Sequence, residues 1–232
     1  MVIKIRKDSN MTEFECAGLK GLARVPKDFN KETRYPVLIY LHGAGTRGNN
    51  IEVLKSGSFF RITEEYCDFP FISVAPLCNA DSWFVLLSEL KRLVKAIADD
   101  ERTDESRIYL IGNSMGGYAT WQLAMNNPQY FAAIVPICGG GMYWNAERLK
   151  HIPIWAHHGN KDERVDVSES IKMVDAICKK GGNAKLTIYE GVGHNCWDAT
   201  YKNPEVFHWL LENVNENPPV ITSDYHDSKL YG

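Results

Sequence analysis

Six short, predominantly apolar runs constrain the fold of this chain more than any other feature. Between several of them lie longer stretches in which apolar residues recur every three or four positions. A continuous apolar run is typical of a strand covered on both faces, and the three-and-four spacing is typical of a helix that packs one face on a sheet. The pattern predicts an α/β fold with a largely parallel sheet. In chain order the runs are residues 37–41, 71–75, 108–111, 133–137, 152–156 and 186–189.

Two segments before these runs complete the predicted sheet. Residues 12–16 and 19–25 are predicted to be strands, joined by Ala17-Gly18 in an antiparallel lead-in. We therefore expect a mostly parallel sheet of eight strands with helices on both faces. No insertion is long enough to predict a large lid domain.

Helical spacing recurs between and after the runs, over residues 83–97, 171–178 and 207–214. Beyond residue 215 the composition turns to Pro, Asp, Ser, Tyr and Asn, and Pro218-Pro219 stops any further helix. A single domain over residues 1–215 and an extended tail over residues 216–232 are expected.

The charge balance excludes several classes of partner. The 232 residues contain 26 Lys and Arg against 29 Asp and Glu, a formal net charge of −3, and the two signs are interspersed. Without a basic stripe, a polybasic segment or a long apolar stretch, we expect no nucleic-acid partner and no membrane partner. A small substrate fits this composition better, with the protein acting as a monomer or homodimer.

The N-terminus and the cysteines indicate the compartment. The first eight residues carry charges where a secretory signal needs an apolar segment, which favours a cytoplasmic location; a signal trimmed from the sequence is the alternative. Six cysteines are scattered without C-x-x-C pairs, and four of them sit in or beside apolar runs. We interpret them as free thiols in a reducing compartment, with a disulfide of Cys67 or Cys78 as the alternative.

The segment Gly112-Asn113-Ser114-Met115-Gly116 is a G-x-S-x-G motif that directly follows the apolar run at 108–111. Residues 118–124 after it have a helical pattern. A serine in a tight turn between a strand and a helix is the nucleophile elbow, in which the flanking glycines avoid backbone clashes and the hydroxyl is lifted above the sheet. The motif and its context predict that Ser114 is a nucleophile.

A serine hydroxyl needs a base and an orienting carboxylate, which on this type of sheet follow in the chain order Ser, Asp or Glu, His. Asp162 lies on a turn after the run at 152–156, and His194 lies in a Gly-rich loop after the run at 186–189. We predict Asp162 as the acid and His194 as the base. Asp166 and Glu163 are the alternative acids, although Asp166 also suits the cap of a helix that starts near residue 167.

The tetrahedral intermediate of acyl transfer needs two preorganised N–H donors for its oxyanion. Met115, next to the nucleophile, is predicted to supply one. The loop after the run at 37–41 is rich in small residues, and Ala44 N–H is predicted as the second donor, with Gly45 as the alternative. His42 is expected to hold this loop.

Aromatic side chains on loops near the predicted site suggest an apolar or sugar-stacking cleft. Core packing is the alternative for each of them. We predict Trp83, Trp144 and Trp197 as substrate-binding residues, and no metal or cofactor is required. The other candidates are Phe59, Phe60 and Tyr143.

The chain resembles the α/β-hydrolase superfamily, and more narrowly a bacterial branch of predicted peptidases and esterases related to dienelactone hydrolases, feruloyl esterases and polyhydroxybutyrate depolymerases. The resemblance covers roughly residues 12 to 214 and implies a serine hydrolase with the triad Ser114, Asp162 and His194. The segments that carry it are Tyr40-Leu41-His42-Gly43-Ala44-Gly45, Arg107-Ile108-Tyr109, Ser114-Met115-Gly116-Gly117-Tyr118, Thr120-Trp121, Phe131-Ala132-Ala133, Pro153-Ile154-Trp155, His158-Gly159 with Asp162, and Gly193-His194-Asn195 with Trp197.

Three departures from that pattern stand out. Asn113 occupies a position that more often holds Leu or another apolar residue in the resembled family, and Cys196 intervenes between Asn195 and Trp197. The nucleophile is Ser rather than the Cys of true dienelactone hydrolases, which argues against that substrate.

Together these features predict a carboxylesterase that works through a Ser-His-Asp acyl-enzyme, on short-chain or aromatic esters of the feruloyl or acetyl type. A serine peptidase or amidase acting on small peptides is the alternative, followed by a non-catalytic binding protein of the same fold. A thiol-dependent hydrolase using Cys138 or Cys196 fits less well, because neither cysteine sits on an elbow.

Overall fold

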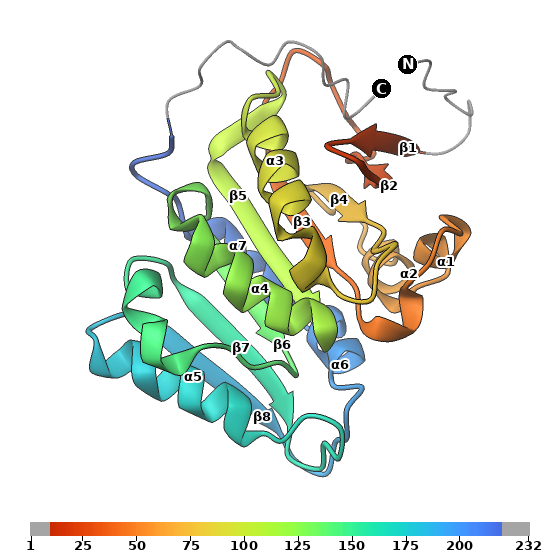
Figure 1. Cartoon of the computed structure of the whole chain (residues 1–232). Helices are drawn as coiled ribbons and strands as arrows, with labels where there is room; N and C mark the ends of the chain where they lie inside the picture. The colour runs from red at the N-terminus through yellow and green to blue at the C-terminus, as the bar shows by residue number, and fades with distance from the viewer. Residues whose placement is uncertain (1–9, 220–232) are drawn as a thin grey trace.

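The computed structural model of the chain describes residues 10–219 and contains a central sheet of eight strands with helices on both faces (Figure 1). The strands are β1 (Met11–Cys16), β2 (Leu19–Arg24), β3 (Tyr35–Leu41), β4 (Ile72–Pro76), β5 (Thr103–Asn113), β6 (Ala133–Ile137), β7 (Ile154–Gly159) and β8 (Ala184–Tyr189). The α-helices are α1 (Glu52–Lys55), α2 (Ser58–Thr63), α3 (Leu87–Ala98), α4 (Met115–Asn126), α5 (Ser168–Lys179), α6 (Trp197–Lys202) and α7 (Pro204–Glu212). Short 3₁₀ helices are η1 (Ala44–Thr46), η2 (Trp83–Leu86), η3 (Pro128–Tyr130) and η4 (Tyr143–Leu149).

The sheet has the strand order β1-β2-β4-β3-β5-β6-β7-β8. β1 pairs with β2, and β2 with β4, in antiparallel fashion, while every other neighbouring pair is parallel. The predicted mostly parallel eight-stranded α/β sheet is therefore confirmed.

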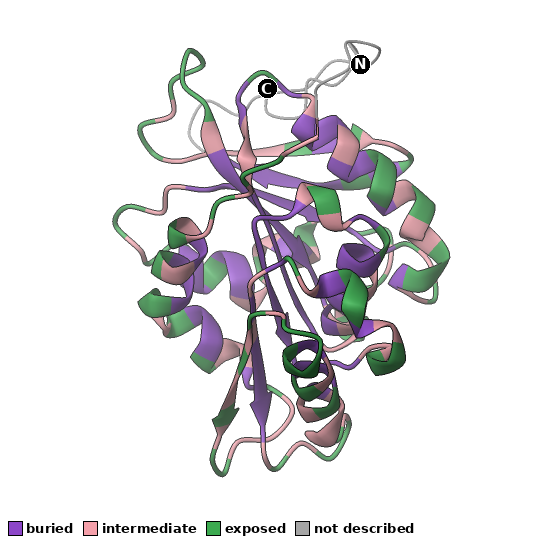
Figure 2. Cartoon of the chain, turned by 90° about the vertical axis from the view of Figure 1, so that its left-hand side faces the viewer, coloured by how far each residue is buried: buried purple, intermediate pink, exposed green. Residues whose placement is uncertain are grey.

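Two apolar cores lie on the two faces of the sheet, and the strands β2 to β7 are buried along most of their length, whereas the outermost strands β1 and β8 are mostly half-buried or exposed (Figure 2). Helices α3, α4 and α5 pack on one face, where residues of α3 such as Leu90 and Ile97 are fully buried. Helices α2, α6 and α7 pack on the other face, around Tyr201 and Phe207. Coverage on both faces explains the continuous apolar runs in the sequence.

Several elements differ from their predictions. β5 begins at Thr103, well before the apolar run at 108–111, and the prediction misses its first five residues because they are polar and residues 104–107 are only partly buried. The helix predicted from residue 83 begins as η2 and becomes α-helical only at Leu87. α1, α2 and α6 were not predicted, since four to six residues are too few to display a helical period.

The last helix ends earlier than predicted. Its final residue is Glu212, and Val214, predicted on the helix face, lies beyond it with about half of its surface exposed. Asn213 ends the helix, because its side-chain amide donates to the carbonyl of Trp209 and its backbone turns into an extended conformation. Of the predicted tail, residues 220–232 lie outside the described part of the chain.

All six cysteines are free, including Cys67 and Cys78. No helix within residues 10–219 has the length and apolarity needed to cross a membrane. The carboxyl ends of the parallel strands lie along one edge of the sheet, so the loops after β3, β5, β6, β7 and β8 are brought together there (Figure 1).

Candidate active site

Ser114 forms the turn between β5 and α4, with a φ of 56° that non-glycine residues rarely adopt. Its N–H donates to the carbonyl of Ile137 at 2.9 Å, which ties the turn to β6. A Cβ on Gly116 would collide with the backbone carbonyl of Leu41, and one on Gly112 would collide with that of Gly116. Both glycines of the motif are therefore required by close backbone approach, as the sequence predicts.

The three predicted triad side chains form one hydrogen-bonded chain. Nε2 of His194 lies 2.8 Å from Oγ of Ser114, and Nδ1 of His194 lies 2.7 Å from Oδ2 of Asp162. A carboxylate only accepts hydrogen bonds, so Nδ1 carries the imidazole proton and Nε2 of the neutral ring accepts the Ser114 hydroxyl proton. This geometry allows His194 to remove that proton.

The Asp162 carboxylate is fully buried and well supplied with donors. Its Oδ1 accepts the N–H groups of Arg164 and Val165, each at 2.9 Å. Burial by itself raises the pKa of Asp162, but the hydrogen bonds from Val165, His194 and Arg164 outweigh it and lower the pKa below its usual value. The group is therefore ionised and fixed in orientation at neutral pH.

His158 is a second imidazole beside Asp162, and the sequence analysis assigns it no role. Its Nε2 lies 3.2 Å from Oδ2 of Asp162 and 2.9 Å from the carbonyl of Val165, and both side chains are completely buried. Because both neighbours of Nε2 only accept, this nitrogen carries a proton and donates toward them. The sequence did contain a signal for this contact, because His158-Gly159 follows a predicted strand and His158 lies four residues before Asp162.

The alternative acids lie elsewhere. Asp166 lies one residue before Val167, the N-cap of α5, and its side chain accepts the N–H of Ser168, the first residue of that helix, at 2.8 Å. Glu163 is exposed, whereas the carboxylate of Asp162 is the one that meets His194.

The two predicted oxyanion donors each begin a helical turn. Met115 is the first residue of α4 and Ala44 the first of η1, and within residues 10–219 neither N–H has a hydrogen-bond partner, as expected at helix starts. The η1 loop lies against the nucleophile, because a Cβ on Gly43 would be 3.5 Å from Cβ of Ser114.

His42 fixes the orientation of this loop. Burial lowers the pKa of His42 to about 4, so the ring is neutral at neutral pH. Its Nδ1–H donates to the carbonyl of Gly43 at 2.8 Å, and its Nε2 accepts the N–H of Cys78 at 3.0 Å. In a trans peptide the N–H points opposite to the preceding carbonyl, so holding Gly43 C=O toward His42 turns Ala44 N–H away from it.

The structure corrects the prediction for Trp83. This residue is completely buried, its ring packs 4.9 Å from that of His42, and its indole N–H donates to the His42 carbonyl at 2.9 Å. A side chain without exposed surface supports the oxyanion loop rather than presenting a wall to substrate. Phe59 and Phe60 are corrected in the same way, since both are buried on α2.

The other predicted aromatic residues keep accessible surface. Trp197 packs edge-on against the His194 ring, with centroids 5.4 Å apart and an interplanar angle of 88°. Trp144 lies on η4 with 71% of its surface exposed, beside Tyr143 at 54%. Trp144 therefore exposes a large apolar surface to solvent, and Trp197 is partly exposed.

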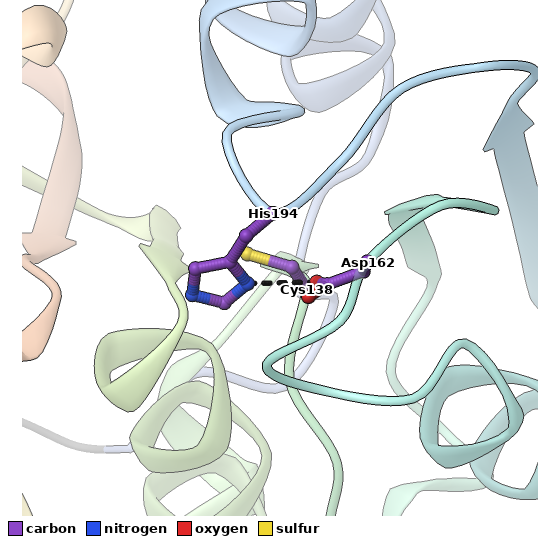
Figure 3. A group of neighbouring side chains, drawn as sticks. All are labelled: Cys138, Asp162 and His194. Carbon is purple, nitrogen blue, oxygen red and sulfur yellow. Dashed lines mark hydrogen bonds and ion pairs between the residues drawn. The ribbon is translucent and has the colours of Figure 1, made fainter.

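Cys138, Asp162 and His194 come close enough to share a metal ion, the sole such group within the described residues (Figure 3). Their potential ligand atoms lie within 4.8 Å of one another. Burial raises the pKa of Cys138 far above its usual range, although a metal site needs the thiolate. The hydrogen bond from His194 to Asp162 also accounts for their contact, so these residues fit a hydrogen-bonded chain better than a metal centre.

Comparison with known proteins matches residues 82–204 to the profile of the dienelactone hydrolase family, a segment that contains Ser114, Asp162 and His194. Among solved structures, a thermostable esterase is similar at 33% identity and a TM-score of 0.75, over 88% of this chain and 63% of its own.

Two curated proteins are also similar. Dipeptidyl-peptidase 5 of Porphyromonas gingivalis is 22% identical in an alignment that covers 79% of this chain and 34% of that protein. Iron(III) enterobactin esterase of Escherichia coli is 34% identical over 89 residues, 38% of this chain and 19% of that protein. The chain thus matches about a third or less of the length of these curated relatives.

Proposed function

The chain belongs to the dienelactone hydrolase family, and from that premise we propose that it is a serine hydrolase that cleaves carboxylic esters through a covalent acyl-enzyme. One observation carries the proposal: the continuous hydrogen-bonded chain from Ser114 through His194 to the buried carboxylate of Asp162, at 2.8 and 2.7 Å. Nucleophile, base and orienting acid at these distances are the arrangement that acyl transfer needs.

In the first half of the cycle, Oγ of Ser114 attacks the ester carbonyl carbon while its proton passes to Nε2 of His194. The imidazolium that forms is stabilised by Asp162, which remains ionised because four donors surround it. When the tetrahedral intermediate collapses, the C–O bond to the alcohol breaks and His194 returns the proton to the leaving alkoxide.

We assign stabilisation of the negative charge on the former carbonyl oxygen to the N–H groups of Met115 and Ala44. Met115 N–H also lies at the start of α4, where the helix dipole favours an anion. Loss of one such donor typically costs ~10²- to 10³-fold in kcat. His42 and Trp83 contribute indirectly, because His42 holds the peptide that carries Ala44 N–H and Trp83 holds the peptide before it.

In the second half, His194 deprotonates a water molecule that attacks the acyl carbonyl, and Ser114 leaves with the proton. The cycle uses protein groups and water alone, so it requires no metal or cofactor. The acid is released and the neutral His194 is restored.

For the substrate, we propose short-chain or aromatic esters bound against Trp144 and Trp197. The exposed face of Trp144 supports this choice, as does the position of Trp197 at the edge of the catalytic imidazole. Similarity to a thermostable esterase points to the same reaction class.

Peptide or amide hydrolysis is the second candidate, and similarity to dipeptidyl-peptidase 5 favours it. The same residues would act, but the leaving amine must be protonated by His194 before it departs, whereas an alkoxide leaves more readily. A non-catalytic binding protein of the same fold is disfavoured, because all three triad groups are present and hydrogen-bonded to one another.

A fluorophosphonate probe tests the proposal. Wild-type protein should be labelled at Ser114, the Ser114→Ala variant should not, and the Cys138→Ala variant should label like wild type. Label retained after Ser114→Ala, or lost after Cys138→Ala, would refute the assignment of the nucleophile. Rates on acetyl, feruloyl and longer acyl esters, measured beside aminoacyl amides, then decide between esterase and peptidase.

A further inference from the structure

Asn113, the residue before the nucleophile, accepts two buried hydroxyl groups. Its Oδ1 lies 3.0 Å from the hydroxyl of Tyr40 and 3.2 Å from that of Tyr201. All three side chains are buried, with Asn113 itself 6% exposed. Burial raises the pKa of both tyrosines, so both remain protonated donors across the working pH range.

The two tyrosines come from the elements that lead to the other parts of the site. Tyr40 lies on β3, two residues before His42 and the oxyanion loop. Tyr201 lies on α6, which begins at Trp197, three residues after His194. The two hydrogen bonds to Asn113 therefore join the nucleophile strand to the oxyanion loop and to the loop of the base.

The amide nitrogen of Asn113 faces the oxyanion loop directly. With Oδ1 turned to the tyrosines, Nδ2 lies where a Cβ on Gly43 would approach it to 3.0 Å. The same Cβ would be 3.5 Å from Cβ of Ser114. The loop, the amide and the nucleophile are thus in close packing, with no room for a side chain between them.

Aromatic packing fixes the two hydroxyl groups. The ring of Phe59 stacks on Tyr40, with centroids 4.3 Å apart and planes 11° from parallel, and meets Tyr201 edge-on at 5.5 Å. Rings held in this way keep their hydroxyls directed at one acceptor. An apolar residue at position 113 would leave both donors without that acceptor.

We propose that Asn113 is a positioning residue that sets the placement of the Ser114 turn, the oxyanion loop and the His194 loop relative to one another. The inference rests on the proposed serine hydrolase function and assigns a role to the position where the sequence departs from the resembled family. Asn113 acts through its neighbours, and a shift of about 1 Å in such a site costs up to ~100-fold in rate.

The test compares three variants by kcat, KM and thermal unfolding on an ester that the wild type hydrolyses. Asn113→Leu should lower kcat roughly 10- to 100-fold with KM within about twofold of wild type. The triple variant Tyr40→Phe/Tyr201→Phe/Asn113→Leu removes both stranded hydroxyls, so its stability should recover toward wild type while kcat stays low. Tyr109→Phe is the matched control. Its hydroxyl, also on β5, donates to the carbonyl of Asn213, far from the triad, so its loss should leave kcat unchanged.

The inhibition constant Ki of phenylboronic acid separates a positioning role of Asn113 from a purely structural one, because a loss of stability alone would not change it. The boronate forms a tetrahedral adduct with the serine oxygen and engages the oxyanion donors, so its Ki should rise in parallel with the fall in kcat. An unchanged kcat in Asn113→Leu overturns the inference, as does recovery of kcat together with stability in the triple variant. A wild type that is neither labelled by fluorophosphonate nor active on any ester or amide refutes the proposed function instead.

Discussion

The protein should be measurably less stable in mild acid, because His42 gains a proton in the unfolded chain and stays neutral in the folded protein. Burial lowers the pKa of His42 to about 4 from its ordinary 6.5. Between these values the unfolded chain binds a proton that the folded protein excludes, so stability is fully present above pH 6.5 and is lost as the pH falls toward 4. The whole difference corresponds to ~3.4 kcal/mol at about 1.36 kcal/mol per pKa unit, of which ~2 kcal/mol is lost by pH 5.

The assay is urea unfolding of wild type and His42→Gln at pH 7 and pH 5. The Gln side chain retains an acceptor for the N–H of Cys78 but has no proton to gain. Other groups titrate equally in both proteins, His157 among them, so the loss in wild type should exceed that in the variant by ~2 kcal/mol. Equal losses in the two proteins would refute the buried neutral state of His42 and the support it gives the oxyanion loop.

Three further outcomes are expected. Asp162→Asn should lower kcat by ~10³- to 10⁴-fold, because an amide leaves His194 without its orienting anion; circular dichroism should show an intact fold, and a smaller loss would contradict the role of Asp162. Gly116→Ala should cost ~3 kcal/mol or more in unfolding experiments, since its Cβ meets the Leu41 carbonyl; normal stability would contradict the close backbone contact. Trp144→Ala should raise KM for aromatic esters while the free energy of unfolding stays within ~0.5 kcal/mol, and an unchanged KM would exclude Trp144 from the substrate site.

The inner part of the sheet was predictable because burial on both faces imposes an apolar pattern that each inner strand carries locally. The apolar runs locate all six parallel strands, and the start of β5 is missed because its residues are polar and residues 104–107 are only partly buried. Short helices such as α2 carry no period of their own, so Phe59 and Phe60 resemble loop aromatics until tertiary contacts bury them.

Position at a strand end and order along the chain can both be read directly from the sequence. This is why Ser114, Asp162 and His194 could be selected among many Ser, Asp and His residues. Their roles remain predictions, although the structure brings the three side chains together. The contacts of Asn113 depend on residues far along the chain, 73 positions away for Tyr40 and 88 for Tyr201, and no local pattern encodes them. His158 lies only four residues before Asp162, so its contact is near in sequence, although its burial depends on the folded chain.

The burial of Trp83 likewise could not be predicted from its sequence position. Its sequence position, on the loop after β4, suits both a cleft wall and a core residue. The choice between them is made by His42, whose carbonyl accepts the indole N–H.

Trapping the acyl-enzyme tests the central claim most directly. Wild-type protein is mixed with p-nitrophenyl acetate, quenched in acid during the initial burst, and analysed by intact-mass and peptide mass spectrometry. The account predicts one acetyl group per chain, on the peptide that contains Ser114, and none in Ser114→Ala. An acetyl group on Cys138 or His194, or turnover with no acyl-enzyme at Ser114, would contradict it.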